Sequence, residues 1–268
     1  MIAAKSFLFE LPVWRVLSDT LPDLSAPHLL IVELRDREQV ILAGLNLNTQ
    51  QQIWTQTLQP TDWWASTIGC YNGTLLLHRY ASNEQPAPKG LMAINAENGQ
   101  IIWELNQLSF VQTDGYCLQT SQQNSAQTLT YEWYTLANGK KLPEMPANWA
   151  EPARVSAWSD SILYAPSNVY YSFLSNFILK KTGQNPVQTI NYAEIDACII
   201  LLYYFYPRDF NTLSRSLLIV DSKKSVLWHE IISDFGDSTS FGGFIHGQNQ
   251  MIYLRSELEL LVLNFKKS

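Results

Sequence analysis

The sequence predicts an all-β fold assembled from repeated four-stranded antiparallel units. Three observations lead to this prediction: the composition favours strands, apolar and polar residues alternate over short segments, and one hairpin pattern recurs along the chain. Hydrophobic residues make up 46% of the 268 residues and aromatic residues 12%, whereas charged residues make up only 16%. Such a composition is rich in strand-forming side chains and poor in the Lys and Glu that favour helices.

The clearest hairpin spans residues 90–104. Met92 and Ile94 point to one face of its first strand, and Asn98-Gly99 supplies a tight turn because both residue types tolerate positive φ. The second strand resumes the alternation and carries a tryptophan. Related hairpins cover residues 45–54, 134–142 and 219–228. The recurrence indicates one structural unit copied along the chain, and it indicates no function by itself.

Alternating segments place a single strand at residues 6–11, followed by a series of units. The first unit has expected strands at 14–16, 28–34, 40–47 and 52–58, and the second at 64–71, 74–80 and the two strands of the clearest hairpin. The third has strands at 109–112, 116–120, 129–136 and 140–142, and the fourth at 187–194, 198–206, 216–220 and 226–232. The last unit has only three, at 241–245, 251–255 and 259–263.

Residues 143–186 interrupt this pattern with several prolines and contain one segment with a helical period, residues 170–183. An apolar stripe at helical spacing should pack on the sheets. The stripe consists of Tyr170, Phe173, Leu174, Phe177 and Ile178. The interruption could instead hold a sixth, degenerate unit. We favour a helical insertion, because strands do not use a 3.6-residue apolar period.

The tryptophans Trp54 and Trp103 and the end of the third unit recur at about 40–50 residues, which is the period of β-propeller blades. We therefore predict a single domain over residues 1–268, a β-propeller of about five four-stranded blades, with six possible. The last unit lacks an outer strand, and the N-terminal strand lacks a neighbour. We expect residues 6–11 to pair with residues 259–263 and close the ring.

The hairpin motif resembles the repeat of the PQQ-like, quinoprotein-type β-propellers. It runs small residue, apolar residue, Asn or Asp, three variable residues, Gly or Ser, and later two apolar residues and Trp. The resemblance implies that Trp54, Trp103 and Trp228 pack between neighbouring blades. The vicinal cysteine pair of the quinoprotein dehydrogenases is missing from the sequence, so we expect a scaffold with no cofactor.

Charge and apolar patterning argue against several classes of partner. The net charge is −6 and the basic residues form scattered doublets, so no basic stripe could neutralise nucleic-acid phosphates. The longest apolar run, residues 197–206, is too short to span a membrane, and the first residues lack a secretory pattern. Cys70, Cys117 and Cys198 are typical of free buried thiols. We therefore expect a cytoplasmic protein.

Glu194 and Asp196, beside Tyr192, form the first candidate site. Residues two apart on a strand project from one face, so this pair could bring two carboxylates to a cleft. A solvated strand end or turn beside Tyr192 is the alternative interpretation of the same residues. The four histidines have no metal-ligand spacing, so we expect no metal site.

Two connections between units form the second candidate site. Trp63 and Trp64 lie in one connection, where one ring could be exposed for stacking or both could pack on a neighbouring blade. Asp234 and Asp237 lie in a Gly-rich connection over residues 233–243. In a propeller such connections meet at one rim, which the insertion would share.

These observations favour a non-enzymatic scaffold that binds a protein or peptide partner at the insertion rim. The motivation is the repeat architecture, the abundance of Trp and Tyr, and the lack of a complete catalytic set. The alternative is a hydrolase or lyase acting on a small or carbohydrate-like ligand, with Trp63, Trp64, Glu194 and Asp196 in its site.

Overall fold

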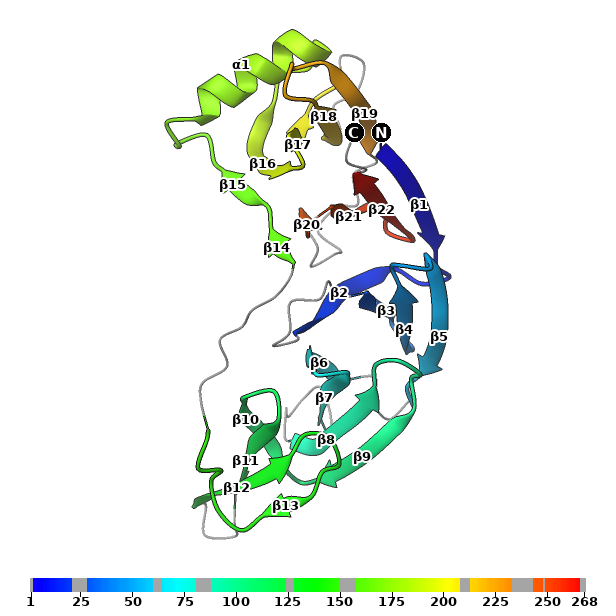
Figure 1. Ribbon diagram of the computed structural model, residues 1–268, viewed down its shortest axis with the longest axis vertical. Helices are drawn as coiled ribbons and strands as arrows, with labels where there is room; N and C mark the ends of the chain where they lie inside the picture. Colours follow the sequence, from blue (N-terminus) through cyan, green and yellow to red (C-terminus); the bar gives the residue numbers. More distant parts are fainter. Residues whose placement is uncertain are drawn as a thin grey trace. The chain divides into compact units, whose positions relative to one another are not determined.

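The computed structural model describes residues 2–20, 28–59, 64–80, 88–123, 128–149, 158–207, 213–232, 243–247 and 249–265. These residues form strands β1 to β22 and one helix, α1, so the prediction of an all-β fold is confirmed (Figure 1). The chain divides into two compact bodies. We call Arg15–Ala157 the central body and Met1–Trp14 with Trp158–Ser268 the terminal body, and we describe each by itself.

Along the chain the central body consists of three four-stranded meanders, and the first two join into one eight-stranded sheet because β2 pairs parallel with β6. The first is β2 (Val13–Thr20), β3 (Leu29–Arg35), β4 (Val40–Asn46) and β5 (Gln51–Thr57). The second is β6 (Ser66–Tyr71), β7 (Thr74–Tyr80), β8 (Pro88–Asn95) and β9 (Ile101–Asn106). The third is β10 (Ser109–Thr113), β11 (Cys117–Gln123), β12 (Leu129–Thr135) and β13 (Lys141–Leu142). These meanders match the first three units expected from the sequence.

Each meander packs one face against the next. Apolar side chains of the first and second meanders, such as Ile31 and Leu75, share one buried cluster. Side chains of the second and third meanders, such as Leu76 and Leu118, share another. Alternation along β7 explains this arrangement, because Leu75 and Leu76 point to opposite faces of the same strand. The second meander is therefore buried on both faces.

A tryptophan on the outer strand fixes each of these two junctions. Trp54 Nε1 donates to the carbonyl oxygen of Ala96 at 2.8 Å, and Trp103 Nε1 donates to that of Leu136 at 2.7 Å. Both acceptors lie in the last turn of the following meander. The predicted packing of Trp54 and Trp103 between neighbouring units is confirmed. Trp228 differs, since its Nε1 donates to Glu230 Oε2 on its own strand at 3.1 Å.

The turn needs a glycine for two reasons. Its backbone has a positive φ, and the missing side chain leaves room for the tryptophan ring. Gly139 has φ of 66°, and a Cβ atom there would lie 2.7 Å from Cγ of Trp103. Gly99 meets the Trp54 ring in the same way. The Asn-Gly turns therefore serve a packing role that their hairpin geometry alone does not reveal.

We expect Gly139→Ala to destabilise the chain more than Gly73→Ala. Gly73 also has positive φ, of 71°, but nothing lies within 4 Å of its added Cβ. Both variants carry the cost of a left-handed alanine, about 1–2 kcal/mol, and only Gly139→Ala adds overpacking of about 1–3 kcal/mol. Urea unfolding measures the difference. Equal losses for the two variants would contradict the tryptophan contact.

The terminal body contains two sheets and the helix. The closing sheet has the order β1-β22-β21-β20-β14, and the fourth meander with an added strand has the order β15-β16-β17-β18-β19. The closing sheet comprises β1 (Ile2–Leu8), β14 (Ser159–Asp160), β20 (Phe244–His246), β21 (Gln250–Ser256) and β22 (Glu259–Phe265). The other comprises β15 (Ile162–Tyr164), β16 (Val187–Ile195), β17 (Cys198–Phe205), β18 (Ser214–Val220) and β19 (Val226–Ile232).

The N-terminal strand completes the last unit, as predicted. β1 pairs antiparallel with β22 over its whole length, from Ile2 opposite Phe265 to Leu8 opposite Glu259. The strand begins and ends earlier than residues 6–11. The chain bends after Leu8, where the amide of Phe9 donates to the carbonyl of Leu258 at 2.9 Å. Phe7 is buried in this register and Leu8 is exposed.

We expect Phe7→Ala to lower the free energy of unfolding by about 3 kcal/mol, because it empties the buried anchor of β1. Leu8→Ala is the matched control on the same strand, and an exposed side chain of this kind should change stability by less than about 0.5 kcal/mol. Chemical denaturation followed by fluorescence measures both. If Phe7→Ala were as mild as Leu8→Ala, β1 would not hold the closing sheet.

The insertion contains the predicted helix. α1 spans Tyr171–Thr182 and ends at Gly183, whose φ of 73° and hydrogen bond to Leu179 close the last turn. Lys180 and Lys181 lie in that turn, as the helix dipole favours. Besides α1, the described residues between 143 and 186 contain the turns that follow β13 and the short strands β14 and β15. They contain no additional four-stranded sheet.

The expected packing of the apolar stripe is only partly correct. Leu174 and Ile178 are buried against the fourth meander, and Phe177 is half-buried there. Phe173 is exposed, so the prediction that it packs on the sheet is wrong. Tyr170 is also largely exposed, but its ring contacts Tyr164 of β15 edge-on, with ring centroids 6.3 Å apart. The apolar stripe is wider than the surface of the helix that contacts the sheet. The helix is rotated about its axis, so only one side of the stripe faces the sheet.

Candidate functional site

The first candidate pair does not share a strand face. β16 ends at Ile195, and Asp196 and Ala197 form the two-residue turn to β17 with φ of 46° and 62°. Such a turn needs positive φ at both positions, a conformation that Asp tolerates. Glu194 stays on the strand, where its carboxylate accepts a hydrogen bond from the Tyr192 hydroxyl. Burial and this bond raise the pKa of Tyr192.

The other candidate residues are not gathered around this pair. The turn holding Asp196 lies at one end of the fourth meander, whereas β19 ends at Ile232 at the other end. Trp63, Asp234 and Asp237 lie outside the described residues. Trp64 belongs to the central body, where its side chain is 38% exposed just before β6.

A largely buried cluster that the sequence did not reveal, which we call the arginine network, contacts the backbone of Ala65, the residue after Trp64. It consists of Arg15 on β2, Glu33 and Arg35 on β3, and Thr67 on β6. Arg35 Nη2 binds Glu33 Oε1 at 2.7 Å and the carbonyl of Ala65 at 2.5 Å. The Thr67 hydroxyl donates to Glu33 Oε2 at 2.6 Å. Arg15 Nη1 donates to the Thr67 carbonyl at 2.6 Å.

The network carries more positive than negative charge. Its single carboxylate, Glu33, is almost fully buried, and each of its oxygens has a partner within the network. The only trace in the sequence is an acidic residue within the apolar run of β3. Glu33 continues the alternation of Ile31, which faces the core, so its burial follows from register.

We expect Glu33→Gln to lower the free energy of unfolding by about 3 kcal/mol, because it removes the buried charge that pairs with half-buried Arg35. Glu38→Gln, in the exposed turn after β3, is the control and should change stability by less than about 0.5 kcal/mol. Urea unfolding at neutral pH measures both. If Glu33→Gln left the free energy of unfolding unchanged, the charge of Glu33 would contribute nothing to stability.

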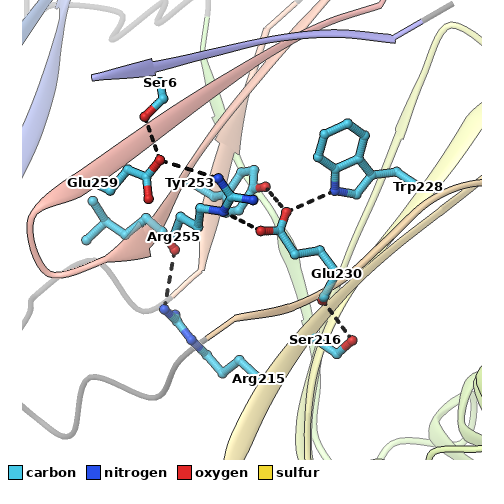
Figure 2. Close-up of polar contacts among 9 residues, drawn as sticks. Ser6, Arg215, Ser216, Trp228, Glu230, Tyr253, Arg255 and Glu259 are labelled. Carbon is cyan, nitrogen blue, oxygen red and sulfur yellow. Dashed lines mark hydrogen bonds and ion pairs between the residues drawn. The ribbon is translucent and has the colours of Figure 1, made fainter. Parts of the chain in front are cut away.

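A second polar network joins the fourth meander to the closing sheet (Figure 2). The Glu230 carboxylate on β19 accepts hydrogen bonds from Trp228, from the Tyr253 hydroxyl at 3.0 Å and from Arg255. Arg255 also approaches Glu259 at 3.5 Å, and Ser6 of β1 donates to Glu259 at 2.5 Å. Burial and the Glu230 charge raise the pKa of Tyr253. The network therefore stabilises the junction that β1 completes.

A third cluster includes a serine and a histidine. His229 Nε2 lies 3.1 Å from Ser216 Oγ and 3.3 Å from Gln184 Oε1, while the Tyr203 hydroxyl donates to Gln184 at 2.5 Å. Burial lowers the pKa of His229. Ser216 and Tyr203 are fully buried, so a substrate cannot reach either hydroxyl. The cluster anchors the end of α1 on the meander.

In the part of the chain that the structure describes, no three His, Cys, Asp or Glu side chains come together as metal ligands. Cys70 is buried, whereas Cys117 and Cys198 are only half-buried, so the expectation of three buried thiols is correct for one. No helix within the described ranges is long and apolar enough to cross a membrane.

Comparisons with known proteins give limited information. A family model for a domain of unknown function, DUF4905, matches residues 25–103. No curated protein matches the chain. A solved member of the DUF4221 family from Bacteroides vulgatus is 10% identical with a TM-score of 0.33, covering 98% of this chain and 96% of that one.

Two further solved structures are similarly distant. The β-propeller domain of the Trilobed protease from Pyrococcus furiosus is 10% identical with a TM-score of 0.30, covering 85% of this chain and 57% of that chain. A putative TolB from Agrobacterium tumefaciens is 9% identical with a TM-score of 0.27, covering 99% and 98%.

Proposed function

We propose that the chain is a non-enzymatic β-propeller scaffold that binds a protein or peptide partner. The observation that supports this proposal is a group of exposed apolar side chains at the start of α1, which we call the uncovered flank of α1. It consists of Val169 and Tyr170, which precede the helix, and Phe173 in its first turn. These side chains are 84%, 62% and 69% exposed. Phe173 lies next to Leu174, which packs on the fourth meander. The Tyr170 ring also contacts Tyr164 of β15 edge-on.

A concentration of large apolar side chains on the surface costs free energy unless something covers it. Isolated exposed apolar residues are common, but neighbouring ones mark interaction sites. Two aromatic rings in this flank offer large contact areas with little loss of conformational freedom on binding. The flank therefore suits an apolar segment of a polypeptide.

The scaffold in this proposal is a ring of five blades formed by the whole chain as one domain. The three meanders of the central body, the fourth meander and the closing sheet would be its blades. The contacts of Trp54 and Trp103 with the following turn support this arrangement, because they have the form that the PQQ-like repeat implies. The pairing of β1 with β22 supports closure by the N-terminal strand.

We do not propose the hydrolase or lyase alternative. It required Glu194 and Asp196 on one strand face, and β16 ends before Asp196. Trp63, Trp64, Asp234 and Asp237 stay sequence-based predictions of the partner surface.

A random-peptide display selection against the folded chain tests the proposal. We expect enriched peptides with apolar residues, and we expect Phe173→Ser to weaken their binding about tenfold, because it removes one aromatic anchor. Fluorescence anisotropy measures the affinity. Leu179→Ser is the matched control, since Leu179 is an exposed apolar residue on another side of the same helix.

Failure to enrich any peptide would contradict partner binding. Equal losses for Phe173→Ser and Leu179→Ser would contradict the assignment of the surface to the uncovered flank. Melting curves of both variants show whether each retains the fold, because neither side chain is part of the buried cluster beneath α1.

A further inference from the structure

The outer strand of the third meander has only two residues. The corresponding outer strands of the other units, β5, β9, β19 and β1, have seven, six, seven and seven. β13 pairs only with the later part of β12, where Trp133 lies opposite Leu142 (Figure 1). The earlier part, Leu129–Glu132, pairs with β11 on one side and with no described strand on the other. We call Leu129–Glu132 the free edge of β12.

The chain does not continue along this edge after β13. It bends beyond Leu142, and the Trp149 amide donates to the Pro146 carbonyl at 3.0 Å. The Trp149 ring then meets the Trp133 ring edge-on, with ring centroids 4.5 Å apart. The chain has thus turned onto a face of the sheet, and no described residue takes the outer position beside the free edge.

Alternation along β12 identifies the main-chain groups that the free edge offers. The Thr135 amide donates to the Lys140 carbonyl at 2.9 Å, on the side of β13. Because the direction of the N–H and C=O groups alternates along a strand, those of Tyr131 and Leu129 face the same side. Each of these two residues offers one donor and one acceptor. Within the described ranges, no hydrogen bond joins them to a neighbour on that side.

The side chains of the same two residues are exposed. Leu129 and Tyr131 are 53% and 55% exposed, and they project from the same face of β12 as Trp133. Natural proteins commonly protect a sheet edge with charged side chains, a proline or a bulge. Here an aliphatic and an aromatic side chain accompany the open main-chain groups, which is the combination that favours pairing with another strand.

The charge within the free edge is already bound. Its only acidic residue, Glu132, pairs with Lys141 and accepts a hydrogen bond from the Tyr134 hydroxyl at 2.6 Å. These contacts hold the pKa of Glu132 below its usual value. The residues of the free edge therefore offer a ligand main-chain hydrogen bonds and apolar contact instead of an ion pair.

The closing sheet shows how this fold completes a unit without a hairpin. β1 comes from the opposite end of the chain and pairs with β22 over its whole length. A separate extended segment therefore suits the outer position. A second copy of the chain suits it less, because so short an edge cannot supply the roughly 1,200 Å² that the smaller stable interfaces bury. Strand addition to an open edge is, however, an established way to bind short peptides.

We propose that the free edge of β12 binds an extended segment of a partner protein as an added antiparallel strand. The segment has apolar residues at alternate positions, opposite Leu129 and Tyr131, whose main-chain groups they bind. Polar residues lie between them, opposite Thr130. The inference rests on the proposed function in that its ligand is a peptide, and it uses a different surface from the uncovered flank of α1.

A random-peptide display selection against the full chain, followed by fluorescence anisotropy on individual enriched peptides, tests the inference. We expect a class of peptides with alternating apolar residues. Their affinity should fall at least about tenfold for Tyr131→Pro, because proline has no N–H to donate and its ring obstructs the edge. Tyr131→Thr keeps the N–H and the preference for strands, so it should weaken binding less than about fivefold.

Ile231→Pro is the matched control, because Ile231 is an exposed apolar residue of another outer strand, β19. It should leave the affinity of these peptides within about twofold. Melting curves of the proline variants show whether each retains the fold.

N-methylation of the peptide tests the same hydrogen bonds from the ligand side, so the inference stays testable even if Tyr131→Pro unfolds. A methyl group on the nitrogen of either apolar residue removes a donor that faces β12, and it should weaken binding about tenfold or more. Methylation of the polar residue between them, whose N–H faces away from β12, should have less than about a threefold effect. Apolar contact alone would not give this alternation.

Four outcomes would overturn the inference. Peptides that are insensitive to Tyr131→Pro and to N-methylation, but sensitive to Phe173→Ser, would leave the proposed function intact without this site. Equal losses for Ile231→Pro would assign the effect to proline in any outer strand. A dimer in light scattering that Tyr131→Pro abolishes would assign the edge to a second copy. No enriched peptides at all would overturn the proposed function together with this site.

Discussion

The contact between a tryptophan on one meander and the last turn of the next is the constraint on which the central body depends. It combines a hydrogen bond from Nε1 to a backbone carbonyl with a glycine that leaves room for the ring. Because the acceptor is a single carbonyl, the contact fixes the position of one sheet along the other, which apolar packing alone would leave free to slide. The apolar clusters on both faces of β7 then follow from that position.

Where this contact is missing, polar networks take its place. Trp228 has the expected position on β19, but it donates to Glu230, which also binds Tyr253 and Arg255 of the closing sheet (Figure 2). A carboxylate that accepts hydrogen bonds from three side chains fixes the position of one sheet relative to the other, as the carbonyl does. Burying its charge costs more free energy than burying a carbonyl. This difference fits the junction that includes β1, which is joined to its sheet by pairing with β22 and by Ser6, and not by a continuous hairpin.

The features that the sequence predicted correctly depend on local patterns and on the number of strands in each unit. The hairpins follow from alternation and Asn-Gly turns, and the pairing of β1 with β22 follows from a count of strands. Features that depend on three-dimensional placement were missed. An apolar stripe gives the width of a helix face but not its roll, so the exposure of Phe173 was not foreseen. The arginine network joins β2, β3 and β6, and only Glu33 in an apolar run hinted at it.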